Sequence, residues 1–126
     1  MNTKEQFVLN LIEATKNNEL IWISKNISGY IQYFNNNIVP IKILGAEYKF
    51  NTVLLCEEVN NKNNKSLKNN MFDYINENTI YNIYLIKESA IQTTISCYEI
   101  SRNIYLNMLK EIVDNYSDRY LSNLLQ

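Results

Sequence analysis

An apolar stripe at helical spacing in the last third of the chain constrains the fold more than any other sequence feature. Its members fall at i, i+3, i+4, i+7, i+8 and i+11: Tyr105, Met108, Leu109, Ile112, Val113 and Tyr116. Ser101 stands just before the stripe at a suitable N-cap position, so a core-facing helix is predicted from there. The residues after the stripe predict a short helical continuation capped by Ser117. Its apolar positions are expected to dock at the C-terminus: Tyr120, Leu121, Leu124 and Leu125.

A second helix is predicted at the start of the chain. Thr3 and Gln6 have the spacing of a capping box, in which each side chain bonds the other residue's backbone N–H. Apolar residues then recur at helical spacing until the Asn17-Asn18 pair: Phe7, Val8, Leu11 and Ile12.

Between the two helices, short segments rich in β-branched and aromatic residues predict strands. They are residues 20–23, 30–34, 38–44, 46–50, 53–56, 80–86 and 91–98. Pro40 favours an edge strand or an irregular connection, because proline cannot donate to a β-ladder. Gly45 predicts a break or bulge, and Asn51-Thr52 the turn of a hairpin. Thr93 interrupts the inward face of the last strand.

Three polar or mixed segments are predicted to connect these elements. The triple asparagine at 35–37 suits a tight turn, because asparagine tolerates positive φ. Residues 59–70 have almost nothing to bury and are predicted to form a mobile surface loop. Residues 71–75 suit a helical turn or a strap that covers the core. The whole pattern predicts one α+β domain over 1–126, with a mainly antiparallel sheet of about five strands and both helices on one of its faces.

Composition excludes several chemistries. The 126 residues contain no histidine and two glycines, so the commonest general base is missing and so are the glycine-rich loops that cradle phosphates. Cys56 and Cys97 lack metal-ligand spacing and are expected to be buried thiols in a reducing cytoplasm. Glu57 and Glu58 would point to opposite faces of a strand and are expected at its solvent end, not as an acid/base pair. No catalytic residue, metal or cofactor is expected.

The net charge and the hydropathy of the chain indicate which kinds of partner to expect. The formal net charge of −1 gives no electrostatic footprint for nucleic acid, so nucleic acid is not an expected partner. No apolar run reaches the roughly 20 residues of a membrane span, and the first residues lack a signal-peptide core. We therefore expect a cytoplasmic protein without membrane contact.

The remaining class of function is the binding of a ligand or partner at the protein surface. Tyrosine and asparagine, 10 and 22 residues here, combine rigid aromatic area with adaptable hydrogen bonding. The candidate ligand or partner residues are therefore aromatic, with two arginines that could fork a phosphate: Tyr30, Tyr33, Phe34, Tyr81, Tyr84, Arg102 and Arg119. Core placement explains each aromatic residue equally well, and a solvated helix face explains each arginine.

Three short stretches carry a resemblance. The order of residues 11–16, residues 20–22 and then residues 45–50, followed by a strand pair and a leucine-rich helix, resembles small uncharacterised proteins of low-GC bacteria and their mobile elements. The resemblance implies a helix–sheet–helix fold and no activity. The chain departs from it by a long insertion between Trp22 and Gly45.

Three functions stay open at this level. The favoured hypothesis is a non-enzymatic phage or mobile-element protein that inhibits a host protein by stoichiometric binding. The alternatives are a sponge that sequesters a nucleotide-like signal, in which aromatic strands stack a base and an arginine holds phosphate, and a histidine-free hydrolase that uses carboxylates. A homo-oligomer through the C-terminal helix is a further hypothesis, because one chain of this size offers little surface to cover all of its apolar end.

Overall fold

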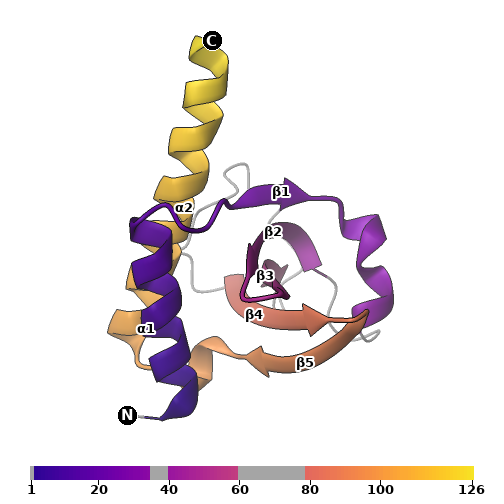
Figure 1. Ribbon diagram of the computed structural model, residues 1–126. Coiled ribbons are helices and arrows are strands. Elements are labelled where there is room, and N and C mark those ends of the chain that lie inside the picture. The colour runs from indigo at the N-terminus through magenta and orange to yellow at the C-terminus, as the bar shows by residue number, and fades with distance from the viewer. Residues whose placement is uncertain (1, 35–39, 60–78) are drawn as a thin grey trace.

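A computed structural model describes residues 2–34, 40–59 and 79–126. It has one sheet of five antiparallel strands in the order β1-β2-β3-β4-β5, with a helix before and after it (Figure 1). This confirms the predicted α+β class. The elements are α1 (Thr3–Lys16), β1 (Ile23–Lys25), β2 (Pro40–Tyr48), β3 (Asn51–Val59), β4 (Thr79–Lys87), β5 (Ala90–Ile95) and α2 (Arg102–Leu125), with 3-10 turns η1 (Ile27–Gly29), η2 (Ile31–Tyr33) and η3 (Cys97–Glu99).

Both helices pack on one face of the sheet, as predicted. Strand residues alternate between faces, so every second side chain reaches the helices. The helix-facing strand residues are Leu44, Ala46, Val53, Leu55, Tyr81, Ile83 and Ile95. The helices contribute Val8, Leu11 and Ile12 from α1 and Tyr105, Met108, Leu109 and Ile112 from α2. The predicted helical stripe therefore forms the main core with the sheet.

The opposite face of the sheet is also covered. Its buried residues are Ile43, Leu54, Cys56, Tyr84 and Ile86, and Tyr30, Tyr33 and Phe34 pack against them. The strand predicted over 30–34 is wrong, because these residues lie in η2 and the bends beside it. Successive 3-10 turns bring the three rings onto one sheet face, which an alternating strand would not do.

β2 continues through Gly45, where a break or bulge was expected, and its pairing with β3 is irregular between Pro40 and Lys42, as the proline favoured. Pro40 is its first residue, and β1 pairs only with 43–45, so the missing N–H lies outside the β1 ladder. Gly45 does not interrupt the strand, since it pairs with both Ile23 and Leu54. A Cβ at Gly45 would lie 2.9 Å from Cε of Lys25. The glycine is there for close approach, not for a bulge.

Both hairpins turn at non-glycine residues. The β2–β3 turn lies at Lys49 and Phe50, two residues before the predicted Asn51-Thr52 position, because Tyr48 pairs with Asn51. The β4–β5 turn lies between Lys87 and Ala90, in the interval left between the strands predicted over 80–86 and 91–98. The pairing of β4 with β5 shifts by one residue between Leu85 and Ile86, and this bulge accommodates the interruption seen at Thr93.

The helix ends differ in part from the predictions. Asn2, not Thr3, caps α1, since its side chain accepts the N–H of Glu5. Ser101 caps α2 as predicted. The cap expected at Ser117 is absent, because α2 runs unbroken through it to Leu125. The end of α2 is not docked on the described part of the chain but projects beyond the sheet and α1 (Figure 1).

A buried amide joins the helix pair to the start of the sheet. Oδ1 of Asn115 on α2 accepts the backbone N–H of Trp22 at 3.0 Å, and its Nδ2 donates to the carbonyls of Leu20 at 3.0 Å and Thr15 at 3.4 Å. The indole Nε1–H of Trp22 donates to Oγ1 of Thr15 at 3.1 Å. Leu20 and Trp22 are thus buried anchors of the α1–β1 connection, whereas β1 begins only at Ile23.

Three predictions fall on undescribed residues. The turn at 35–37 and the helical turn at 71–75 lie outside the described residues. The same holds for the predicted mobile loop at 59–70, except for Val59, which ends β3.

Candidate interaction surface

The aromatic residues of the second sheet face are packed against one another. Phe34 meets Tyr84 edge to face with ring centroids 5.0 Å apart, and Tyr30 and Tyr33 lie 6.2 Å apart. Burial raises the pKa of the Tyr30 hydroxyl, with smaller contributions from the negative charge of Glu47 and from Tyr33. The structure therefore brings four of the candidate residues together as a cover for the sheet.

Tyr81 and Tyr84 do not form one patch. They are three residues apart on β4, and an odd separation places them on opposite faces. Tyr81 lies in the main core, and its backbone N–H donates to the hydroxyl of Tyr105 at 3.2 Å. Burial raises the pKa of Tyr105, so this hydroxyl remains protonated and structural.

The two candidate arginines cannot hold one phosphate together. Arg102 and Arg119 stand 17 residues apart on α2, which is about 25 Å along a helix. Backbone N–H groups at the start of α2, next to Arg102, already have hydrogen-bond acceptors. The side chain of Ser101 caps the helix, and Oε2 of Glu5 accepts the N–H of Ser101 at 2.8 Å. A carboxylate at this place opposes the binding of an anion.

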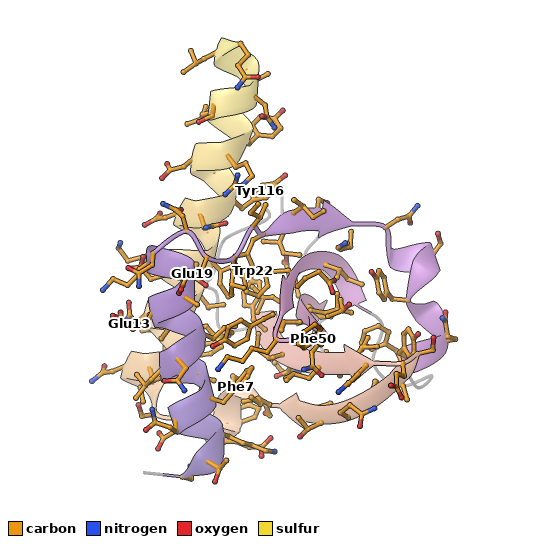
Figure 2. The ribbon with its side chains drawn as sticks, viewed as in Figure 1. Phe7, Glu13, Glu19, Trp22, Phe50 and Tyr116 are labelled. Carbon is orange, nitrogen blue, oxygen red and sulfur yellow. The ribbon has the colours of Figure 1, made fainter. Side chains whose placement is uncertain are left out.

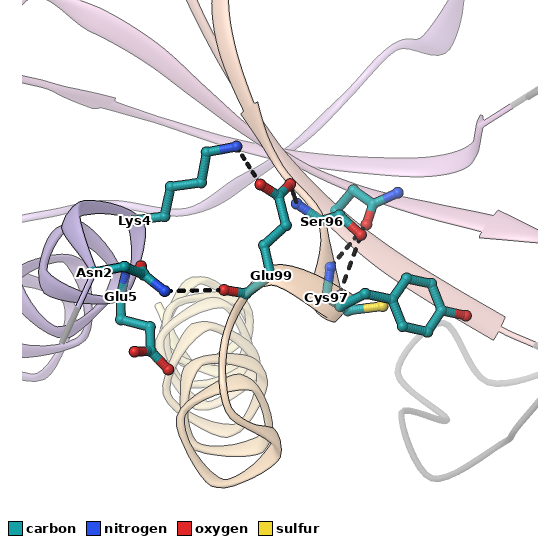
Figure 3. A network of polar contacts seen from close by, with 8 residues as sticks. Asn2, Lys4, Glu5, Ser96, Cys97 and Glu99 are labelled. Atoms are coloured by element: carbon teal, nitrogen blue, oxygen red, sulfur yellow. Dashed lines mark hydrogen bonds and ion pairs between the residues drawn. The ribbon is translucent and has the colours of Figure 1, made fainter.

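Polar contacts around η3 tie the start of α1 to the start of α2. Lys4 forms an ion pair with Glu99, and Nδ2 of Asn2 donates to the Glu99 carbonyl (Figure 3). The backbone N–H of Ser96 donates to Oε1 of Glu99 at 3.0 Å. The hydrogen bond from Lys4, followed by that from Ser96, lowers the pKa of Glu99. This network connects the starts of the two helices and is not an open binding site.

The carboxylates and thiols give no catalytic constellation within the described ranges. The expectation that Glu57 reaches solvent is wrong: β3 continues through it, and it is 2% exposed on the helix-facing side. Cys56 is buried and Cys97 is half-buried, and the two are not joined in a disulfide. Among residues 2–34, 40–59 and 79–126, no three histidine, cysteine or acidic side chains gather as a metal site would require.

Phe50 is the residue that the sequence did not single out. It lies at the tip of the β2–β3 hairpin with its side chain 94% exposed (Figure 2). Its backbone has φ 67°, and Lys49 before it has φ 49°. Two central residues with positive φ are typical of a type I′ turn, in which asparagine and glycine are preferred. A bulky residue in this region is an outlier that costs about 1–2 kcal/mol.

The hairpin tip is held in place by its own side chains. Nδ2 of Asn51 donates to the carbonyl of Lys49 at 2.9 Å, and Oγ1 of Thr52 donates to Oε2 of Glu47 at 2.8 Å. Nζ of Lys49 lies 5.2 Å from the ring centroid of Tyr48, which in turn packs against α1. The phenyl ring of Phe50 is therefore presented to solvent from an organised turn.

A second exposed apolar surface lies on the C-terminal half of α2. We call it the α2 stripe, and its members are Tyr120 (56% exposed), Leu121 (56%), Leu124 (66%) and Leu125 (87%). The ring of Tyr120 lies beside that of Tyr116, with centroids 6.3 Å apart and planes tilted by 32°. These residues belong to the last turns of α2, the end of which projects beyond the sheet and α1 (Figure 1).

Comparison with known proteins adds no relative. No protein-family model, no curated protein and no solved structure matches this chain. In the part of the chain that is described, neither helix is both long enough and apolar enough to cross a bilayer.

Proposed function

We propose that this chain is a non-enzymatic binding protein that inhibits a host protein by stoichiometric occupation, with the β2–β3 hairpin tip as its contact. The observation that carries the proposal is Phe50, a large aromatic side chain held 94% exposed on left-handed backbone. The left-handed pair is the geometry of a two-residue hairpin turn and recurs at Glu88 and Ser89, so the exposed phenyl ring is what sets the β2–β3 tip apart.

A purely structural role does not account for Phe50. A ring so exposed contributes almost nothing to the core, and a glycine or asparagine would relieve the strained turn. Binding accounts for both features, since a rigid aromatic anchor that enters an apolar pocket is a typical hot spot of a protein interface. The side chains around Phe50 already have partners within the hairpin, which reduces the entropy that binding must remove.

The setting of the proposal comes from composition and from the cysteines. An asparagine-rich, AT-coded composition supports an origin in a low-GC bacterium, its phages or its mobile elements, in line with the resemblance noted in the sequence. Two cysteines that are not joined in a disulfide support action in a reducing cytoplasm. The inhibited target is then a protein of the same cell.

The test compares Phe50→Gly with Tyr98→Gly. Tyr98 is a matched control, because it is an 80% exposed aromatic residue in η3, away from the hairpin. The wild-type chain is immobilised and exposed to lysate of a low-GC bacterium. The retained protein is then purified, mixed with the chain and titrated for stoichiometry, affinity and loss of its own activity.

Phe50→Gly is expected to raise the free energy of unfolding by about 1 kcal/mol and to weaken binding at least tenfold. Tyr98→Gly is expected to keep the affinity. A Phe50→Gly variant that is less stable and binds as tightly as wild type would show that the ring has a structural role. A retained protein that is chemically converted, instead of occupied at a fixed ratio, would contradict a non-enzymatic function.

A further inference from the structure

We infer that a second copy of this chain covers the α2 stripe and that the protein is a homodimer joined through its C-terminal helices. This inference is independent of the binding function proposed for Phe50, since it concerns a different surface. Figure 2 places Phe50 at the sheet, away from the projecting end of α2.

The α2 stripe only partly continues the core face of the helix. An α-helix turns about 100° per residue. Leu121 is nine residues beyond the buried Ile112, so it points to the opposite side of α2, whereas Tyr120 stands 11 residues beyond the buried Leu109 and points to nearly the same side. The apolar surface therefore turns away from the core face along the last turns of α2, where the helix projects beyond the sheet and α1 (Figure 1).

The exposed area suits a weak dimer. Fully exposed tyrosine and leucine side chains each present on the order of 150–200 Å². At the exposed fractions of the four residues, the α2 stripe offers roughly 400–500 Å². Two copies would then bury roughly 800–1,000 Å² in total, which is the size of a weak interface and smaller than the standard interface of about 800 Å² from each partner.

The chemistry of the α2 stripe favours a copy of itself over a different partner. Residues 120–126 carry no charged side chain, so two such helices meet without like charges in opposition. Leucine is under-represented among the hot spots of transient complexes, whereas homodimer interfaces are more apolar than other interfaces. Two identical helices that cross antiparallel about a two-fold axis bury the same patch on both copies and close the assembly.

The test is the mass of the full chain in solution. Sedimentation or native mass measurement from micromolar to hundreds of micromolar is expected to give twice the chain mass of 14.9 kDa for wild type. The double variant Leu121→Asp/Leu124→Asp is expected to stay monomeric at every concentration with unchanged circular dichroism. The control Tyr98→Asp, an exposed aromatic away from α2, is expected to dimerise like wild type. A monomeric wild type, or a double variant that still dimerises, overturns the inference.

Cross-linking gives a second and independent result. A cysteine at Leu121 is expected to form an intermolecular disulfide under mild oxidation, because the two-fold arrangement brings the central turns of the stripes together. A cysteine at the exposed Asn107, on the same helix beside the body, is expected to form none. Equal cross-linking at both positions would show random collision and would contradict the arrangement.

Discussion

Replacement of Asn115 by leucine is expected to be among the most destabilising single changes at any polar residue of α2. Leucine fills a similar volume, so it keeps water out of the site while it removes the amide. The backbone N–H of Trp22 and the carbonyl of Leu20, each 3.0 Å from the amide, then lose their partners. A buried polar group without a partner costs about 1–3 kcal/mol. The longer 3.4 Å contact to the Thr15 carbonyl is left out of the estimate.

The expected loss for Asn115→Leu is about 3 kcal/mol, out of the roughly 5–15 kcal/mol that holds a domain of this size together. Urea unfolding followed by circular dichroism measures it, and the melting temperature is expected to fall by about 10 °C. Asn107→Leu is the matched control, because Asn107 is exposed on the same helix. Its effect is expected to stay within about 0.5 kcal/mol. If Asn115→Leu is as stable as wild type, the hydrogen bonds of the Asn115 amide do not stabilise the contact between α2 and the α1–β1 connection.

Two further changes test the sheet and the polar contacts around η3. Gly45→Ala is expected to lower the free energy of unfolding by about 1–3 kcal/mol, because its Cβ would crowd carbons of Lys25 and Leu54 at 2.9–3.1 Å. If urea unfolding shows no loss of stability, these two side chains move aside without cost. Since the pKa of Glu99 is lowered from about 4.5 by its bond from Lys4, the contribution of this pair is full above that unfolded value and is lost as the pH falls through the lower folded value. Lys4→Met should therefore be less stable than wild type at neutral pH, with the difference closing once the pH is below the folded pKa of Glu99. A stability difference that persists in strong acid would contradict the ion pair.

The sequence predicted the elements that depend on regular spacing. Tyr105, Met108, Leu109 and Ile112 repeat at helical intervals and form the core face of α2 as expected. Asn115 is the next position on that same face, three residues after Ile112, so a buried polar group could have been expected there. Its partners in the α1–β1 connection could not, because they are set by tertiary packing.

The sequence failed where chain direction or turn position decides the outcome. Ala46, Tyr48 and Phe50 alternate as in one half-buried strand, but the turn at 49–50 removes Phe50 from the face that the other two share. The rings of Tyr30, Tyr33 and Phe34 fit a strand equally well by propensity, and only contact with the second sheet face selects 3-10 turns. Phe50 was therefore not predicted as an interaction residue, because the position of the turn at 49–50 was not predicted.

The order of the strands has a kinetic consequence. Every strand pairs with its neighbour in sequence, so the β2–β3 and β4–β5 hairpins each close over a short turn, whereas the β1–β2 and β3–β4 connections are longer. The contact between α1 and α2 instead joins residues about 100 positions apart, as between Thr15 and Asn115. Loop-closure entropy makes such a contact late in folding. The two helices are therefore expected to act as a latch: they set how slowly the native state opens, and they contribute little to how fast the sheet first forms.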